Sequence, residues 1–209
     1  ADPVQRDRWL RHGGTWFVGV DALPNAADGS IDGVPLPRPW AGLLADPAAW
    51  HPAQLSVVYP GYPRQDPDES EAAHRFRRIR CGAHVDGLHL QDGRRVLREP
   101  HAFVLGIGLT DVEDSPLVVW EGSHEIIRRA LAGAELGDDV TEAYKAARAE
   151  VFERCAKVPV PLRPGDAVLV HRLAVHGIAP WAGGGLDPRL TAYFRPLFER
   201  SSDWTARRP

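Results

Sequence analysis

Residues 80–87 read Arg-Cys-Gly-Ala-His-Val-Asp-Gly, and the rest of the chain is interpreted outward from this stretch. The pattern predicts a β-strand that ends in a His-x-Asp pair. Alternate side chains of an extended strand share a face, so His84 and Asp86 would project together while Val85 points the opposite way. An imidazole beside a carboxylate supplies two ligands of a two-histidine, one-carboxylate metal site. Such a site suits Fe(II) and leaves coordination positions open for oxygen and a co-substrate.

The remaining ligand must come from a distant segment, and residues 165–180 contain two candidate histidines. A Gly-Asp turn at 165–166 precedes an apolar run that predicts a buried strand ending at His171. His176 lies five residues after His171 and is followed by Gly177. From spacing alone, either histidine could complete the metal site.

Arg189 is the candidate anchor for an acidic co-substrate. It lies 13 residues beyond His176, at the start of another predicted strand, 190–194. A guanidinium fork binds a carboxylate through two parallel hydrogen bonds, which a lysine does less well. Thr191 shares the Arg189 face by alternation and could add a hydroxyl contact.

This ordered set of motifs resembles the Fe(II)/2-oxoglutarate-dependent dioxygenases, and more closely their phytanoyl-CoA dioxygenase-like branch. The similarity covers roughly residues 54–196 and includes three further motifs: Leu-Thr-Asp at 109–111, Glu-Gly-Ser-His at 121–124, and Gly-Asp at 165–166. The resemblance implies that His176 is the third ligand and that His171 packs beside the site. It implies that Arg189 binds 2-oxoglutarate, and that His124 has a packing or hydrogen-bonding role. His89 and His101 have no assigned role.

The activity implied by the resemblance is hydroxylation of a small organic substrate with O2 and 2-oxoglutarate, releasing succinate and CO2. Asp86 keeps the carboxylate ligand, which argues against a halogenase, because that chemistry needs the position vacant for halide. Two alternatives remain open. A cupin-like metalloenzyme that does not use 2-oxoglutarate would not need Arg189, and a non-catalytic jelly-roll protein that binds a small molecule would hold no iron.

Many short strands with turn signals, interrupted by one helical stretch, predict a mainly β fold: a double-stranded β-helix (jelly roll, cupin-like) with flanking helices. We expect a single domain over 1–209. Its expected parts are a covering segment at 1–50 with a strand at 16–20 and a short helix over 40–50, a jelly-roll core at 54–197, and a loosely held tail at 198–209. Residues 124–156 are expected to form a helical excursion over or beside the cavity mouth, or alternatively a static helical layer that backs the sheet. The predicted strand over 101–110 has a face of small residues, which indicates close approach by a ligand or by another backbone.

The composition is that of an ordinary globular domain. The 209 residues carry 25 Lys and Arg against 28 Asp and Glu, a net charge of −3 that argues against a general nucleic-acid binder. No apolar run of about 18 residues predicts a membrane span. No basic start followed by an apolar core marks a signal peptide. Two cysteines are too few for a disulfide framework. The expected location is therefore the cytoplasm.

Arg80 is the candidate substrate-binding residue, for an anionic primary substrate. On a regular strand it would share a face with His84 and lie roughly 13 Å from it, at about 3.3 Å per residue. That distance would place it near a carboxylate or phosphate remote from the reacting carbon. The alternative is that Arg75, Arg77, Arg78 and Arg80 form a solvated basic edge that pairs with acids such as Glu69.

Overall fold

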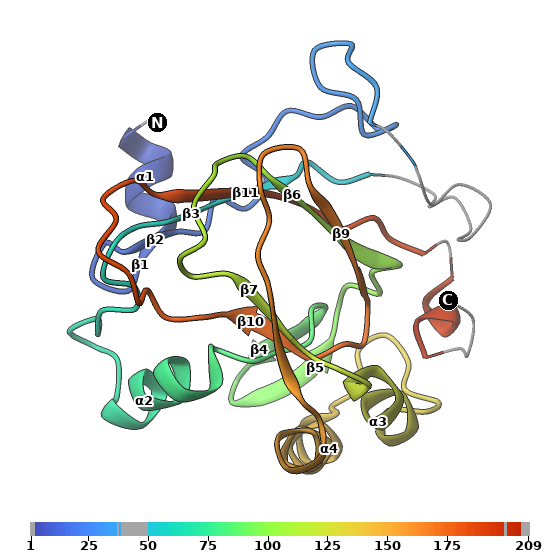
Figure 1. Cartoon of the computed structure of the whole chain (residues 1–209). Helices are drawn as coiled ribbons and strands as arrows, with labels where there is room; N and C mark the ends of the chain where they lie inside the picture. Colours follow the sequence, from blue (N-terminus) through green and yellow to red (C-terminus); the bar gives the residue numbers. More distant parts are fainter. Residues whose placement is uncertain (1–2, 37, 39–49, 199, 206–209) are drawn as a thin grey trace.

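The computed structural model describes residues 3–36, 38, 50–198 and 200–205, and over these residues antiparallel strands form three sheets (Figure 1). The largest sheet has six strands. In spatial order they are β1 (Leu10–Arg11), β2 (Trp16–Phe17), β3 (Gln54–Val58), β11 (Arg189–Phe194), β6 (Phe103–Gly108) and β9 (Ala167–His171). Strands far apart in sequence are neighbours here, so the sheet brings Arg189 beside β3.

The two smaller sheets lie below the large one in Figure 1. One is ordered β10 (His176–Ile178), β7 (Leu117–Trp120), β8 (Lys157–Val160), and the other is the hairpin of β4 (Leu88–Gln91) and β5 (Arg94–Leu97). Val104 and Tyr193 of the large sheet pack with Leu117 of the three-stranded sheet in one buried cluster. The core therefore lies between facing antiparallel sheets, and the prediction of a mainly β fold is confirmed.

The N-terminal segment contributes to the sheet itself as well as covering it. Trp16 pairs with Val58 and Phe17 with Val57, so β2 extends the six-stranded sheet beyond β3. The strand predicted at 16–20 is confirmed at Trp16–Phe17. The short helix predicted over 40–50 lies, up to residue 49, outside the described residues.

The strand predicted over 80–87 is wrong: Arg80 is the last residue of the helix α2 (Glu71–Arg80), and residues 81–87 form turns with a single bridge at His84. Ser70 caps α2 by accepting a hydrogen bond from the Ala73 N–H at 3.2 Å, and Cys81 ends it in a left-handed conformation with φ 55°. His84 and Asp86 therefore lie on an irregular segment between α2 and β4. A single bridge, in which the backbones of His84 and His176 exchange hydrogen bonds of 2.9 and 3.0 Å, ties this segment to β10.

The helical excursion forms two helices, α3 (Ser123–Ala130) and α4 (Thr141–Arg154), in the lower part of Figure 1. They bury Ile127, Tyr144 and Val151 in a cluster that includes Trp120 of β7. The Val85 N–H donates to the Tyr144 hydroxyl at 3.0 Å, so α4 directly supports the segment that carries His84 and Asp86. Within the described residues, no helix is long and apolar enough to cross a bilayer.

The C-terminal segment contains the 3-10 helix η1 (Ser201–Trp204), whose Trp204 is fixed in the core, which corrects the expectation of a loose tail at that residue. Helix α1 (Pro3–Trp9) lies at the N-terminal end. The Trp204 side chain is fully buried in the cluster of Trp120. Arg172 donates to the Trp204 carbonyl at 2.8 Å and fixes the segment there.

The small residues of β6 are explained by close packing. A Cβ on Gly108 would lie 2.4 Å from the Arg163 carbonyl oxygen, and one on Gly106 would lie 2.9 Å from the Tyr193 ring. The close approach expected over 101–110 is therefore made by the protein's own backbone and by an aromatic ring.

Gly177 has a similar role next to the candidate ligand His176. A Cβ there would lie 2.2 Å from the Cys81 carbonyl oxygen, which accepts a 3.0 Å hydrogen bond from the Ile178 N–H. Gly177→Ala should push the end of α2 away from β10 and lower the free energy of unfolding by about 1–3 kcal/mol. Denaturant unfolding measures this loss. Gly184→Ala is the matched control, because a Cβ there would meet no described atom within 4 Å; equal stability of both variants would contradict the packing argument.

Candidate metal centre

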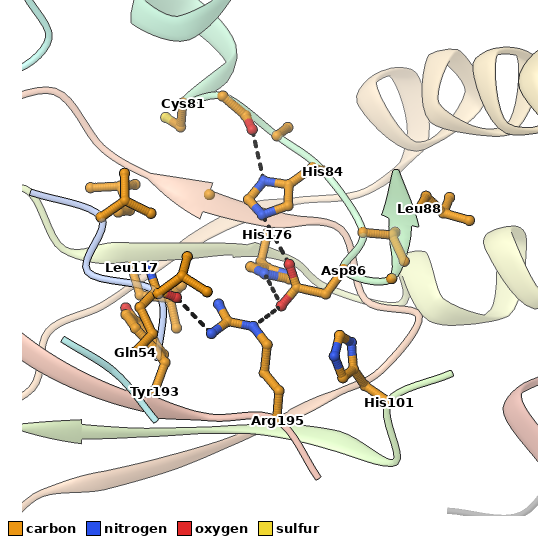
Figure 2. A pocket seen from close by; sticks show the side chains of 18 of the residues that line it. Gln54, Cys81, His84, Asp86, Leu88, His101, Leu117, His176, Tyr193 and Arg195 are labelled. Atoms are coloured by element: carbon orange, nitrogen blue, oxygen red, sulfur yellow. Dashed lines mark hydrogen bonds and ion pairs between the residues drawn. The ribbon is translucent and has the colours of Figure 1, made fainter. Parts of the chain in front are cut away.

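His84, Asp86 and His176 converge in the structure as the sequence predicted (Figure 2). Their ligand atoms all lie within 4.8 Å of one another. His84 Nε2 is 3.2 Å from Asp86 Oδ1, and His176 Nε2 is 3.6 Å from Asp86 Oδ2. The three side chains offer two nitrogens and one carboxylate on a common side, which could hold a metal ion such as Fe(II).

Backbone carbonyls orient both imidazoles. Nδ1 of His84 lies 2.9 Å from the Gly82 oxygen, and Nδ1 of His176 lies 2.9 Å from the Ala174 oxygen. A carbonyl oxygen only accepts hydrogen bonds, so each Nδ1 must carry the proton. Each Nε2 then faces Asp86 and is the ring nitrogen left to bind a metal.

Arg195 and Gln54 complete the surroundings of Asp86, and the sequence analysis identified neither. Arg195 Nε donates to Asp86 Oδ2 at 2.6 Å, and its Nη1 donates to Gln54 Oε1 at 2.6 Å (Figure 2). Burial raises the pKa of Asp86, but Arg195 and the two imidazoles lower it by more, so it lies well below its usual value. Asp86 is thus held as a carboxylate. Extending the alternation of β11 from Arg189 by three steps would have found Arg195.

The candidate ligands open onto a cavity of about 660 Å³ between the sheets. The large sheet contributes Gln54 and Tyr193, the position directly after β11 contributes Arg195, and β10 contributes the segment 176–178. His101 and His89, left without a role by the sequence, also line this cavity on either side of Glu99. Tyr193 is buried, and its hydroxyl has no hydrogen-bond partner among the described residues.

Arg189 is buried at the start of β11. It is 2 % exposed and donates from Nη1 to the Thr191 hydroxyl at 2.7 Å, so the predicted pair lies together. Its Nε and Nη2 have no hydrogen-bond partner among the described residues. Arg189 does not itself line the cavity; Tyr62 does, and the Arg189 charge partly offsets the burial that raises the Tyr62 pKa to about 12.

The structural premise for Arg80 as a substrate-binding residue is wrong. Arg80 is the last residue of α2, its guanidinium lies 4.5 Å from the Phe152 ring centroid, and it does not line the cavity of the metal centre. The strand geometry that placed it on the His84 face does not exist. Arg77, one turn earlier, does line the cavity and pairs with Glu69 at 3.3 Å.

His171 is separate from the metal centre, so of the two histidines at 171 and 176 only His176 joins it. The His171 ring packs against His124 with centroids 4.7 Å apart, and its Nδ1 accepts a hydrogen bond from the Leu173 N–H at 3.1 Å. The packing roles expected for His171 and His124 match this arrangement. Burial, with the nearby Arg172 and His124, lowers the His171 pKa to about 4.

The low histidine pKa values predict a loss of stability in mild acid. His12 and His171 both have a pKa of about 4 in the folded protein, chiefly through burial. The unfolded chain binds these protons near pH 6.5, so between about pH 6.5 and 4 it holds more protons than the native state. The free energy of unfolding of the metal-free protein should then fall as pH falls, by up to about 1.4 kcal/mol per pH unit for each histidine.

Urea unfolding at pH 7.5 and pH 5 measures this dependence. His171→Asn retains an acceptor for the Leu173 N–H and should reduce the difference between the two pH values. His89→Asn replaces a half-exposed histidine and should not. An unchanged pH difference in His171→Asn would contradict the assignment.

The chain is similar to several solved structures over part of their length. No family model matches the chain, and no curated protein matches it. Among solved structures, it is similar to the non-heme alpha-ketoglutarate-dependent carbocyclase SnoK from nogalamycin biosynthesis, at 17% identity and TM-score 0.38 over 72% of this chain and 53% of SnoK. It is similar to Fe-bound EctD from S. alaskensis at 18% identity and TM-score 0.38, over 73% and 46% of the two chains.

A third similar structure is an N-substituted L-amino acid dioxygenase from Burkholderia ambifaria, at 17% identity and TM-score 0.38 over 78% of this chain and 61% of that one. The chain thus spans less than two thirds of the length of each of these three proteins.

Proposed function

We propose that this protein is a non-haem Fe(II)- and 2-oxoglutarate-dependent oxygenase that hydroxylates a small organic substrate and releases succinate and CO2. We propose further that residues 1–209 form one domain whose facing sheets are a double-stranded β-helix over 54–197. The sequence motifs favour the phytanoyl-CoA dioxygenase-like branch of these enzymes. Neighbouring β3, β11 and β6 in one sheet, opposite β10 and β7 in another, support the jelly-roll arrangement.

The donor set fits iron. Two neutral imidazoles with free Nε2 lone pairs and one ionised carboxylate are the ligands of the facial triad, and the rest of the coordination sphere is left to exogenous groups. His84, Asp86 and His176 would hold the metal. When bound, Fe(II) would supply O2 activation coupled to oxidative decarboxylation of 2-oxoglutarate.

The observation that carries the co-substrate assignment is the incomplete pairing of Arg189. A buried guanidinium without an anionic partner is costly, because desolvation of the charge is not repaid. Among the residues that the structure describes, Nε and Nη2 of Arg189 have no hydrogen-bond partner. A carboxylate can accept two parallel hydrogen bonds from one guanidinium. The distal carboxylate of 2-oxoglutarate would therefore accept hydrogen bonds from Nε and Nη2 of Arg189. Thr191 orients the fork through Nη1.

Other groups of the centre orient the side chains that would hold the metal. Arg195 holds the Asp86 carboxylate through Oδ2 and is itself held by Gln54. The Gly82 and Ala174 carbonyls fix the ring planes of His84 and His176.

Anaerobic titration of the purified protein with Fe(II) and 2-oxoglutarate tests the proposal. Chelation of the iron by the 2-oxo acid should give a weak visible charge-transfer band that appears only when both are present. Fe(II) binding without dependence on 2-oxoglutarate would favour a cupin-like metalloenzyme. Absence of Fe(II) binding would favour a non-catalytic jelly-roll protein.

A further inference from the structure

Four arginines line the cavity of the metal centre, and two of them have carboxylate partners. Arg195 pairs with Asp86, and Arg77 pairs with Glu69. Arg95 of β5 and Arg148 of α4 are the other two. Neither forms an ion pair with a carboxylate among the described residues. The wall of the cavity therefore carries two uncompensated positive charges.

Both of these arginines contact the segment that carries the candidate ligands. Arg148 Nη1 donates to the Ala83 carbonyl at 3.3 Å, and Arg95 Nη1 donates to the Leu88 carbonyl at 3.2 Å. The two carbonyls flank the His84–Asp86 pair on either side. The guanidiniums thus lie beside the metal centre without contacting its ligand atoms.

Arg95 and Arg148 lie on elements that the backbone joins. The Val140 N–H donates to the Arg95 carbonyl at 2.8 Å and connects β5 to the start of α4. The positive charges of Arg148 and Arg95 both oppose the burial that raises the Tyr144 pKa, and the Arg148 guanidinium lies 5.2 Å from the Tyr144 ring centroid. Figure 1 shows α4 beside the β4–β5 hairpin.

Aromatic rings hold the Arg148 guanidinium in a fixed orientation. Its carbon lies 4.9 Å from the Phe76 ring centroid and 5.2 Å from that of Tyr144. Phe76 lines the same cavity. A stacked guanidinium loses little rotamer freedom when it binds, which favours recognition of a planar or tetrahedral oxyanion.

We propose that the primary substrate is an anion and that Arg95 and Arg148 bind its carboxylate or phosphate group, away from the reacting carbon. This assignment rests on the proposed oxygenase function and replaces the sequence-based choice of Arg80. Each guanidinium has five N–H groups and uses one of them on the backbone carbonyl named above, which leaves donors for a ligand. Asp21 and Glu99, the cavity acids outside the metal centre, are exposed and do not neutralise this pair.

A purely structural role makes a different prediction. If Arg95 and Arg148 only supported the two backbone carbonyls, their replacement would affect folding and metal binding, but not the preference for acids over neutral isosteres. The decisive readout is therefore the ratio of two binding constants measured on the same variant.

Isothermal titration of the metal-free protein with phenylacetate, phenyl phosphate and neutral phenylacetamide measures that ratio. We expect at least one acid to bind about tenfold or more tightly than the amide, as charge-assisted hydrogen bonds contribute. Arg95→Gln and Arg148→Gln should remove the preference, and Arg148→Lys should retain part of it. Arg94→Gln and Lys145→Gln are the matched controls, because both side chains are exposed and do not line the cavity.

Arg189→Leu separates this site from the proposed co-substrate position. Loss of acid binding in Arg95→Gln and Arg148→Gln, but not in Arg189→Leu, supports the proposal, and the preferred acid identifies carboxylate or phosphate. Loss only in Arg189→Leu overturns it while leaving the oxygenase function intact. Equal binding of acid and amide, or no binding of either acid up to about 10 mM, also overturns it.

Discussion

Asp86→Ala should remove Fe(II) binding. Asp86 is the only anionic member of the group that could hold a metal, and its two oxygens lie within 3.6 Å of the imidazole Nε2 atoms on both sides. Alanine leaves two neutral nitrogens, which bind divalent iron far more weakly than the complete triad. We expect the iron content after anaerobic loading to fall from about one per chain to background, as the loss of a charged ligand should exceed the 10- to 100-fold cost typical of supporting residues.

The same substitution should also lower stability. Arg195 donates a hydrogen bond of 2.6 Å to Asp86. Removal of one partner from a buried ion pair lowers the free energy of unfolding by about 3–5 kcal/mol. The loss should be smaller here, because the Arg195 side chain is 23 % exposed. Glu99→Ala is the matched control: it removes another carboxylate from the cavity wall but none from the triad. Iron occupancy of Asp86→Ala equal to that of Glu99→Ala would refute the metal assignment.

The convergence of His84, Asp86 and His176 could be predicted from the sequence, although the local structure assigned to the first two residues was wrong. His84 and Asp86 face the same way, but on an irregular segment and not on a strand. Their i, i+2 relation survives because His84 is held in an extended bridge with His176. Helix α2 escaped recognition because four of its ten residues are arginines and its apolar residues Ala72, Phe76 and Ile79 form a short stripe with no fully buried member.

Contacts set by strand register could not be read from the sequence. Gln54 reaches Arg195 because β3 pairs with β11, with Gln54 opposite Tyr193. Nothing in either segment alone specifies that register, since both are short and apolar. Trp204 was missed for a related reason: its burial depends on Arg172, a residue distant in sequence that holds its carbonyl.

Arg189→Leu should weaken 2-oxoglutarate binding by well over tenfold while leaving the fold intact. The variant would leave the far carboxylate of the co-substrate without its partner in a buried position, at a cost of about 2–5 kcal/mol, or well over tenfold in apparent affinity. Anaerobic titration of the iron-loaded variant, followed through the charge-transfer band, measures this loss. Iron binding should persist, because Arg189 is not a member of the triad. Arg189→Lys keeps the charge but not the fork and should bind with intermediate affinity.

The stability of the same variant separates an anchor for an anion from a structural arginine. In the ligand-free protein two nitrogens of the buried Arg189 side chain lack partners among the described residues, so an apolar replacement of similar size should leave the free energy of unfolding unchanged or raise it. Arg172→Leu is the matched control. Arg172 is equally buried, at 2 % exposed, but donates to the Trp204 and Asp203 carbonyls at 2.8 and 3.2 Å, so its loss should destabilise the fold. If Arg189→Leu were as destabilising as Arg172→Leu and still bound 2-oxoglutarate normally, Arg189 would be a structural residue and the co-substrate would have to be held elsewhere.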